Sequence, residues 1–169
     1  MTAMGRMKPE PQKPGPNQES VWDYPRPPRQ EHSEQHIKVL FDGQTIAETR
    51  RSVRILETSL APSYYIPPED VNFDLLRARD RTTWCEWKGK AHYYDVEVGE
   101  TVAVNVAWAY PDPTSPYEQI QDYLSFYPSR VECYVDGELA EPQPGAFYGG
   151  WVTSHVVGPF KGEPGTQNW

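Results

Sequence analysis

Two Asp-Gly dipeptides restrict the fold of this chain more than any other feature. Asp42-Gly43 lies between residues 36–41 (HIKVLF) and 44–48 (QTIAE), and Asp136-Gly137 separates two similar segments. Apolar and polar side chains alternate in these segments, which is typical of β-strands with one buried face. Because Asp-Gly favours the two-residue turn of a β-hairpin, each site predicts a pair of antiparallel strands. The chain is therefore expected to be mainly β.

Signals for helices are few and short. Pro68 and two acidic residues precede an apolar pattern that predicts one short helix over residues 72–78. Ser115-Pro116 is followed by Glu118 in the order of a capping box, which predicts a second short helix ending near Leu124. Short strands broken by turns, with one or two short helices, favour several mostly antiparallel sheets.

The chain is expected to form a single β-rich domain over residues 19–169. Its 169 residues suit one hydrophobic core, and aromatic residues at 13% supply apolar area that disordered chains lack. Residues 1–18 are rich in Pro, Gly, Gln and Lys without apolar periodicity, so we expect a disordered tail. Residues 20–28 join aromatic side chains to several prolines and are expected to dock onto the domain in extended form.

Composition argues against several classes of partner. The formal net charge is −8 and the 16 basic residues are scattered, so a nucleic acid is not expected. No apolar run approaches the ~18 residues of a membrane span, and no signal peptide is evident near Met1. We therefore expect a soluble cytoplasmic protein without a membrane partner.

The densest chemistry of the chain lies in residues 84–95 (WCEWKGKAHYYD). If Lys88-Gly89 is a two-residue hairpin turn, Trp84 lies opposite Tyr93 and shares a face with Glu86. That face would hold aromatic walls with a carboxylate among them. Such a pocket suits a flat or cationic small molecule, through stacking and cation–π attraction.

The predicted ligand-binding residues combine aromatic side chains with two carboxylates. Glu57 shares the parity of the apolar residues in its own strand, which adds a second acid to the pocket. The full set is Glu57, Trp84, Glu86, Tyr93, Trp108 and Trp151. An unknown small molecule is thus the expected partner.

Three alternatives to this pocket stay open at the level of sequence. Glu57 and Glu86 could be the acid and base of an enzyme. Glu86 could instead form a structural salt bridge with Arg54 or Arg130 inside an ordinary core. Third, the chain could be an interaction module or homo-oligomer with an exposed aromatic patch. That patch would consist of Trp22, Tyr24 and Trp169.

The two cysteines predict little chemistry. The same hairpin turn would set Cys85 opposite His92, as in a nucleophile and its base, but strand pairing alone produces that adjacency. Cys85 and Cys133 form no CxxC pair, so neither a zinc site nor any other metal or cofactor is expected.

Several landmarks, in this order, resemble a bacterial family of domains of unknown function, family 427. They are residues 19–27 (ESVWDYPRP), 56–59 (LETS), 64–71 (YYIPPEDV), 85–89 (CEWKG), 93–96 (YYDV), 148–153 (YGGWVT) and 158–162 (GPFKG).

The resemblance implies a fold but no chemistry. The fold is one of several coiled antiparallel sheets, similar to the β-tent of methionine sulfoxide reductase B and the cereblon ligand domain. Some members carry a nucleotidyltransferase-like name. The metal-binding pair of acids after a Gly-Ser turn that such an activity needs is not found in this sequence.

Overall fold

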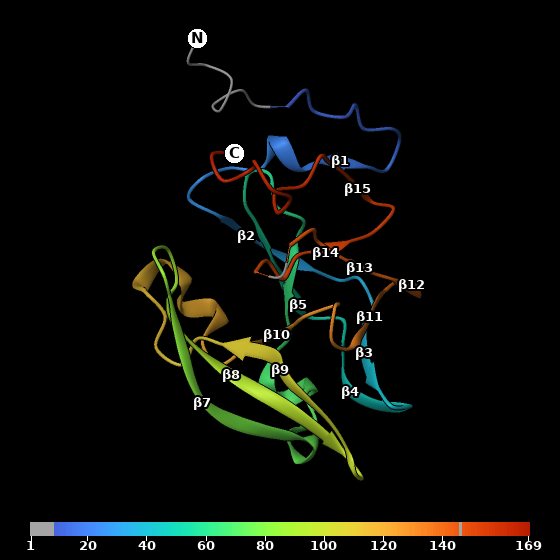
Figure 1. Ribbon diagram of the computed structural model, residues 1–169, viewed down its shortest axis with the longest axis vertical. Coiled ribbons are helices and arrows are strands. Elements are labelled where there is room, and N and C mark those ends of the chain that lie inside the picture. Colours follow the sequence, from blue (N-terminus) through green and yellow to red (C-terminus); the bar gives the residue numbers. More distant parts are fainter. Residues whose placement is uncertain (1–8, 146) are drawn as a thin grey trace.

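The computed structural model describes residues 9–145 and 147–169, and they form a mainly β protein of several small sheets (Figure 1). The sheet with the longest strands has the order β10-β9-β8-β7 and is antiparallel throughout. Its strands are β7 (Leu76–Cys85), β8 (Gly89–Val98), β9 (Thr101–Ala109) and β10 (Leu124–Phe126).

A second four-stranded sheet has the order β12-β11-β3-β4 and contains both Asp-Gly turns. Its strands are β3 (Ile37–Phe41), β4 (Gln44–Thr49), β11 (Glu132–Val135) and β12 (Glu138–Leu139). Phe41 pairs with Gln44 and Val135 pairs with Glu138, so both predicted hairpins are confirmed. Asp42 and Asp136 have φ values of 49° and 50°, as the first position of a type I′ turn requires.

The remaining strands form three smaller sheets. β2 (Arg29–Ser33), β5 (Ser52–Leu56) and β6 (Ser63–Tyr65) form an antiparallel sheet in the order β2-β5-β6. β13 (Glu141–Pro142) pairs with β14 (Trp151–Val152) in antiparallel fashion, and β1 (Glu19–Ser20) pairs with β15 (Val156–Val157) in parallel. The β1–β15 pair thus joins residues 19–20 to residues 156–157.

The helices are shorter than the sequence predicts. Where a helix was expected over 72–78, only a 3-10 turn forms (η4, Phe73–Leu75), and the chain continues as β7 because Leu76 pairs with Val96 of β8. Pairing with a neighbouring strand here overrides a weak helical pattern. The capping-box segment is likewise a 3-10 helix (η5, Ser115–Ile120), and the other two 3-10 helices of the described residues are η2 (Val21–Asp23) and η3 (Pro68–Asp70).

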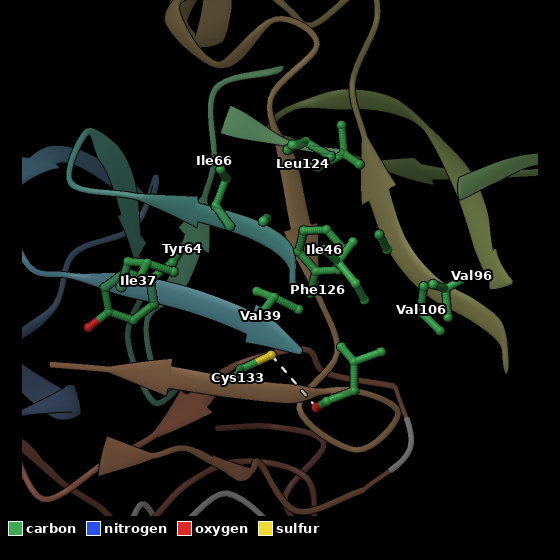
Figure 2. Close-up of a cluster of buried hydrophobic side chains, with 14 of the residues drawn as sticks. Ile37, Val39, Ile46, Tyr64, Ile66, Val96, Val106, Leu124, Phe126 and Cys133 are labelled. Carbon is green, nitrogen blue, oxygen red and sulfur yellow. Dashed lines mark hydrogen bonds between the residues drawn. The ribbon is translucent and has the colours of Figure 1, made fainter. Parts of the chain in front are cut away.

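The main core cluster lies where strands of different sheets meet. Figure 2 shows Val39 of β3 close to Ile46 of β4 and Phe126 of β10, with Cys133 beneath Val39; Ile37 lies beside Tyr64 on one side and Val106 beside Val96 on the other. These side chains are fully buried. Burial raises the pKa of the Cys133 thiol well above its usual range, so this cysteine is an apolar core residue.

The N-terminal segment lies against the domain. Residues 9–18 form no helix or strand, yet the backbone N–H of Gln12 donates to the Gly158 carbonyl at 2.9 Å. The N–H of Gly158 donates in return to Gln12 Oε1 at 3.0 Å. Residues 1–8 of the predicted tail lie outside the described residues, and the boundary at residue 18 stays a prediction.

Candidate functional site

A second core cluster, which we call the aromatic cluster, lies between the β10-β9-β8-β7 sheet and strands β5 and β6. Val53, Ile55, Ala91 and Ile120 line its floor, and Cys85 packs at its edge. Its rings are those of Tyr65, Trp87, Tyr93, Trp108, Tyr110, Tyr117, Tyr123 and Tyr127. Trp87, Tyr123 and Tyr127 are only partly buried, so the cluster reaches the surface on that side.

Tyr93 and Trp108 form the centre of the aromatic cluster. They are directly opposite each other on β8 and β9, so their side chains share the inward face. Trp108 Nε1 donates a hydrogen bond to the Tyr65 hydroxyl at 2.9 Å, and the two rings meet at 89°. The Tyr127 ring lies 4.5 Å from the Trp108 ring, centroid to centroid.

Three phenols of the aromatic cluster, those of Tyr65, Tyr110 and Tyr127, stay protonated at neutral pH. Burial raises the pKa of Tyr65 and of Tyr110. Burial, followed by the neighbouring Tyr93 hydroxyl, also raises the pKa of Tyr127. The Tyr93 hydroxyl itself lies 2.7 Å from Thr83 Oγ1. The protonated phenols of Tyr65, Tyr110 and Tyr127 can therefore donate hydrogen bonds but do not supply a general base.

Two cations lie against rings of the aromatic cluster. The Arg81 guanidinium, from β7, is 4.7 Å from the centroid of the Tyr93 ring. Lys88 Nζ is 5.8 Å from the centroid of the Tyr110 ring, and Lys88 as a whole is only 8% exposed. These two charged groups are basic, whereas the sequence predicted carboxylates at the aromatic site.

The hairpin between β7 and β8 corrects the predicted register. Cys85 pairs with Gly89 and Trp84 with Lys90, so the loop has three residues, 86–88, instead of two. The prediction that Trp84 lies opposite Tyr93 is therefore wrong, and Trp84 is 75% exposed. Because side chains alternate along a strand, an odd shift in register moves each of them to the other face.

The same shift separates Cys85 from His92. His92 pairs with Thr82, which removes the predicted arrangement of a thiol opposite an imidazole. The longer loop is held from outside the hairpin, since the Thr114 N–H donates to the Lys88 carbonyl at 3.0 Å. The Thr114 hydroxyl also donates to the Trp87 carbonyl at 2.6 Å. Figure 1 shows the hairpin end beside the segment that carries η5.

The two predicted carboxylates differ in their surroundings. Glu86 is exposed in the hairpin loop. Glu57 follows β5, and its Oε2 lies 3.7 Å from Arg26 Nε. Its charge also contributes, after burial and Cys85, to a raised pKa of Tyr117. Glu57 therefore lies near Tyr117 of the aromatic cluster. Of the two alternative partners expected for Glu86, Arg54 binds Glu19 and Glu31, and Arg130 donates to the Val104 carbonyl.

Trp151 belongs to the main core cluster. Its side chain is fully buried, and its ring lies 4.9 Å from that of Tyr64. Of the six residues predicted to bind a ligand, the structure thus brings Tyr93 and Trp108 together and sets Glu57 at the border. Trp84 and Glu86 are exposed.

We expect Glu86→Gln to leave the stability almost unchanged. An exposed loop carboxylate forms no buried ion pair, so the free energy of unfolding should change by no more than about 0.5 kcal/mol. Urea denaturation followed by circular dichroism measures this change. A loss of several kcal/mol would show that Glu86 is a scaffold residue.

Sequence reasoning missed Tyr65, Tyr127, Arg81 and Lys88. Tyr65 and Tyr127 enter the aromatic cluster from outside the β7–β9 strands, and no local pattern predicts that meeting. The sequence predicts Lys88 only as part of a tight two-residue turn with Gly89. One signal was available for it, because a lysine amid aromatic residues has the composition of a cation–π pair.

Two further structural features bear on function, metal-binding clusters and membrane-spanning helices. Within residues 9–145 and 147–169, no three His, Cys, Asp or Glu side chains gather closely enough to hold a metal ion. In the same part of the chain, no helix has the length and apolar character needed to cross a membrane.

Comparison with known proteins identifies a family but no activity. No curated protein matches the chain. A family model described as a domain of unknown function (DUF427) matches residues 29–137, which is more than half of the chain and includes every ring of the aromatic cluster. The chain therefore belongs to the DUF427 family of domains of unknown function.

Proposed function

We propose that this domain binds a small flat molecule at the rim of the aromatic cluster. The observation that supports this most is the position of Tyr127, partly exposed and 4.5 Å from the buried Trp108 ring. A planar ligand stacked beside Tyr127 would extend an existing aromatic array. Each such ring pair contributes about 0.5–1.5 kcal/mol beyond the area that it buries.

Arg81 supports the same location. Its guanidinium lies over the Tyr93 ring although Arg81 itself is exposed, so a planar group reaches this ring from the surface. The Tyr93 hydroxyl and the protonated phenol of Tyr127 would orient polar atoms of the ligand. Recognition of this kind needs no nucleophile.

The two alternatives have less support. An acid–base enzyme needs both carboxylates at one ligand, but Glu57 lies beside Arg26 and Glu86 is exposed in the hairpin loop. The aromatic patch of an interaction module folds onto its own domain. Tyr24 is buried, and Trp22 meets Trp169 edge to face at 5.5 Å while its Nε1 donates to the Pro159 carbonyl.

The test is a screen of flat aromatic fragments against the six tryptophan indole N–H signals of the ¹⁵N-labelled protein. Signals are assigned by single Trp→Phe variants. We expect ligands to shift Trp108 and Trp87, and to leave the signal of Trp151 in place. Tyr127→Leu should weaken binding about tenfold, since it removes a stacking partner worth about 1 kcal/mol.

Tyr134→Leu is the matched control. Tyr134 lies on β11, outside the aromatic cluster, and its hydroxyl donates to Glu132. This variant should bind fragments as the unchanged protein does. Shifts confined to Trp84 or Trp22, or equal binding by the Tyr127 and Tyr134 variants, would contradict the proposed function.

A further inference from the structure

We propose that the Lys88 ammonium binds an oxyanion, a carboxylate or a phosphate, carried by the ligand of the aromatic cluster. This inference rests on the proposed function and specifies its ligand. It follows from the position of Lys88 and from its surroundings among the described residues, where no carboxylate pairs with it. A comparison with Arg54, a second cationic residue with low exposure, supports the inference.

The Lys88 side chain is fixed inside the domain. The backbone of the loop is held by the Thr114 N–H at the Lys88 carbonyl, and the next residue, Gly89, has a φ of +103°. A side chain at position 89 would be strained at this φ and would contact the carbonyl of Asp112 at 3.5 Å. The loop thereby turns Lys88 inward, where it is 8% exposed.

Within residues 9–145 and 147–169, the ammonium of Lys88 has an aromatic neighbour but no carboxylate at ion-pair distance. Its Nζ lies 5.8 Å from the centroid of the Tyr110 ring. Among the residues that the structure describes, none forms a hydrogen bond or an ion pair with this nitrogen. Burial raises the pKa of Tyr110, so that phenol is neutral and does not serve as the counter-ion. In the described part of the chain, the buried side-chain nitrogen and oxygen atoms that lack a partner are those of Ser52, Asn105 and Ser125, so Lys88 Nζ is not fully enclosed and an anion from solution can reach it.

Arg54 shows how the same chain satisfies a buried cation. It is 7% exposed, and its guanidinium binds both oxygens of Glu19 at 3.0 and 3.2 Å. A third contact, to Glu31, measures 2.6 Å. Buried charges are normally paired in this way. Lys88 as a residue is covered to a similar extent, but its ammonium has a ring in place of two carboxylates and reaches solvent, which leaves a position for an oxyanion of the ligand.

The ligand class follows from these surroundings. A planar portion would stack on the rings of the aromatic cluster, and an oxyanion on that portion would accept hydrogen bonds from Lys88 Nζ. The net charge of −8 repels anions at long range. A preference for an anionic ligand must therefore come from a local cation, and a variant of Lys88 should remove it.

The experiment compares three probes that share one ring system: 2-naphthoate, 2-naphthyl phosphate and the neutral 2-naphthamide. Dissociation constants are measured by NMR titration for the unchanged protein, Lys88→Met and Lys90→Met. Met keeps the length of the lysine stem without its charge. Lys90 is the control, because it is exposed and lies two residues away in the same hairpin.

We expect at least one anionic probe to bind the unchanged protein and Lys90→Met at least tenfold more tightly than 2-naphthamide does. In Lys88→Met this preference should vanish. Tighter binding of naphthoate identifies a carboxylate ligand, and tighter binding of naphthyl phosphate identifies a phosphate. Lys88→Met should also melt at about the same temperature as the unchanged protein, since the substitution removes no ion pair or hydrogen bond formed by Nζ with the described residues.

Two results would overturn the inference and leave the proposed function intact. In the first, all three probes bind equally well. In the second, Lys88→Met retains the preference for anions. A melting temperature of Lys88→Met well below that of Lys90→Met would also overturn it, because Lys88 would then be a scaffold residue. If no probe binds, this inference is wrong, and the fragment screen decides the proposed function separately.

Discussion

Replacing Trp151 by alanine is expected to lower the free energy of unfolding by about 3–5 kcal/mol, the usual effect of deleting a buried tryptophan. The side chain is fully buried in the main core cluster. Its ring packs 4.9 Å from that of Tyr64, and its Nε1 donates to the Phe126 carbonyl at 2.9 Å. Urea denaturation followed by circular dichroism measures the loss, since fluorescence would itself change with the substitution.

Trp84→Ala is the matched control for this prediction. The same deletion at a position that is 75% exposed should change the free energy of unfolding by about 0.5 kcal/mol or less. The loss of unfolding free energy for Trp151→Phe should lie between these two values. This variant keeps an aromatic ring but leaves the buried Phe126 carbonyl without its donor, which costs about 1–3 kcal/mol. Equal effects at positions 84 and 151 would contradict the assignment of Trp151 to the core.

The parts of the fold that the sequence predicts are those decided by local chemistry. Asp42-Gly43 and Asp136-Gly137 form hairpins because both positions of each turn have positive φ, between 49° and 83°. Asp and Gly adopt that conformation at little cost. The alternation of apolar residues beside these turns is equally local. For this reason the β class and both hairpins are predictable without knowledge of the rest of the chain.

The register of the β7–β8 hairpin depends on contacts from elsewhere. Its three-residue loop is held by Thr114, which lies well beyond β8 in sequence. The pairings are shifted again by irregularities between Ala78 and Thr82, and between Tyr94 and Val96. No signal within residues 84–95 reports these features, and an odd error in register reverses the faces of the strand.

The candidate site was predictable only in part, for the same reason. From a Gly99-Glu100 turn the sequence predicts Tyr93 opposite Val106, whereas Tyr93 pairs with Trp108. This shift of two residues is even, so Tyr93 and Trp108 still share a face. Tyr65 joins them from β6, and Lys88 joins them because the loop folds inward. Both arrangements depend on tertiary contacts between segments that are distant in sequence. The sequence therefore predicted an aromatic site with the carboxylates of Glu57 and Glu86, whereas the structure places the ammonium of Lys88 beside the rings.

Arg54→Met is expected to lower the free energy of unfolding by about 2–3 kcal/mol. Arg54 is on β5, and its guanidinium binds Glu19 of β1 and Glu31 of β2. Arg54 therefore connects β1 to the β2-β5-β6 sheet. The loss should be smaller than for a fully buried triad, because the side chains of Glu19 and Glu31 are 47% and 43% exposed.

Arg51→Met provides the control for charge removal alone. Arg51 precedes β5 and binds Asp70 at 3.1 Å, but its side chain is 63% exposed. Surface pairs of this kind contribute about 1 kcal/mol or less. A loss for Arg54→Met no larger than that for Arg51→Met would contradict the structural role of the buried pair.

The dependence of stability on pH gives an independent test of the Arg54 contacts. Burial alone would raise the pKa of Glu19, but hydrogen bonds from Arg54 and Tyr24 outweigh it and lower that pKa below the ordinary 4.5. A carboxylate with a lowered pKa stabilises the folded state above its unfolded pKa and loses that contribution as pH falls through the folded value. The stability difference between the unchanged protein and Arg54→Met should therefore be constant above about pH 5.5 and shrink below about pH 4.5. Asp70, whose pKa is also lowered, is present in both proteins and cancels in the difference. A difference that stays constant down to about pH 3 would show that Glu19 gains nothing from Arg54.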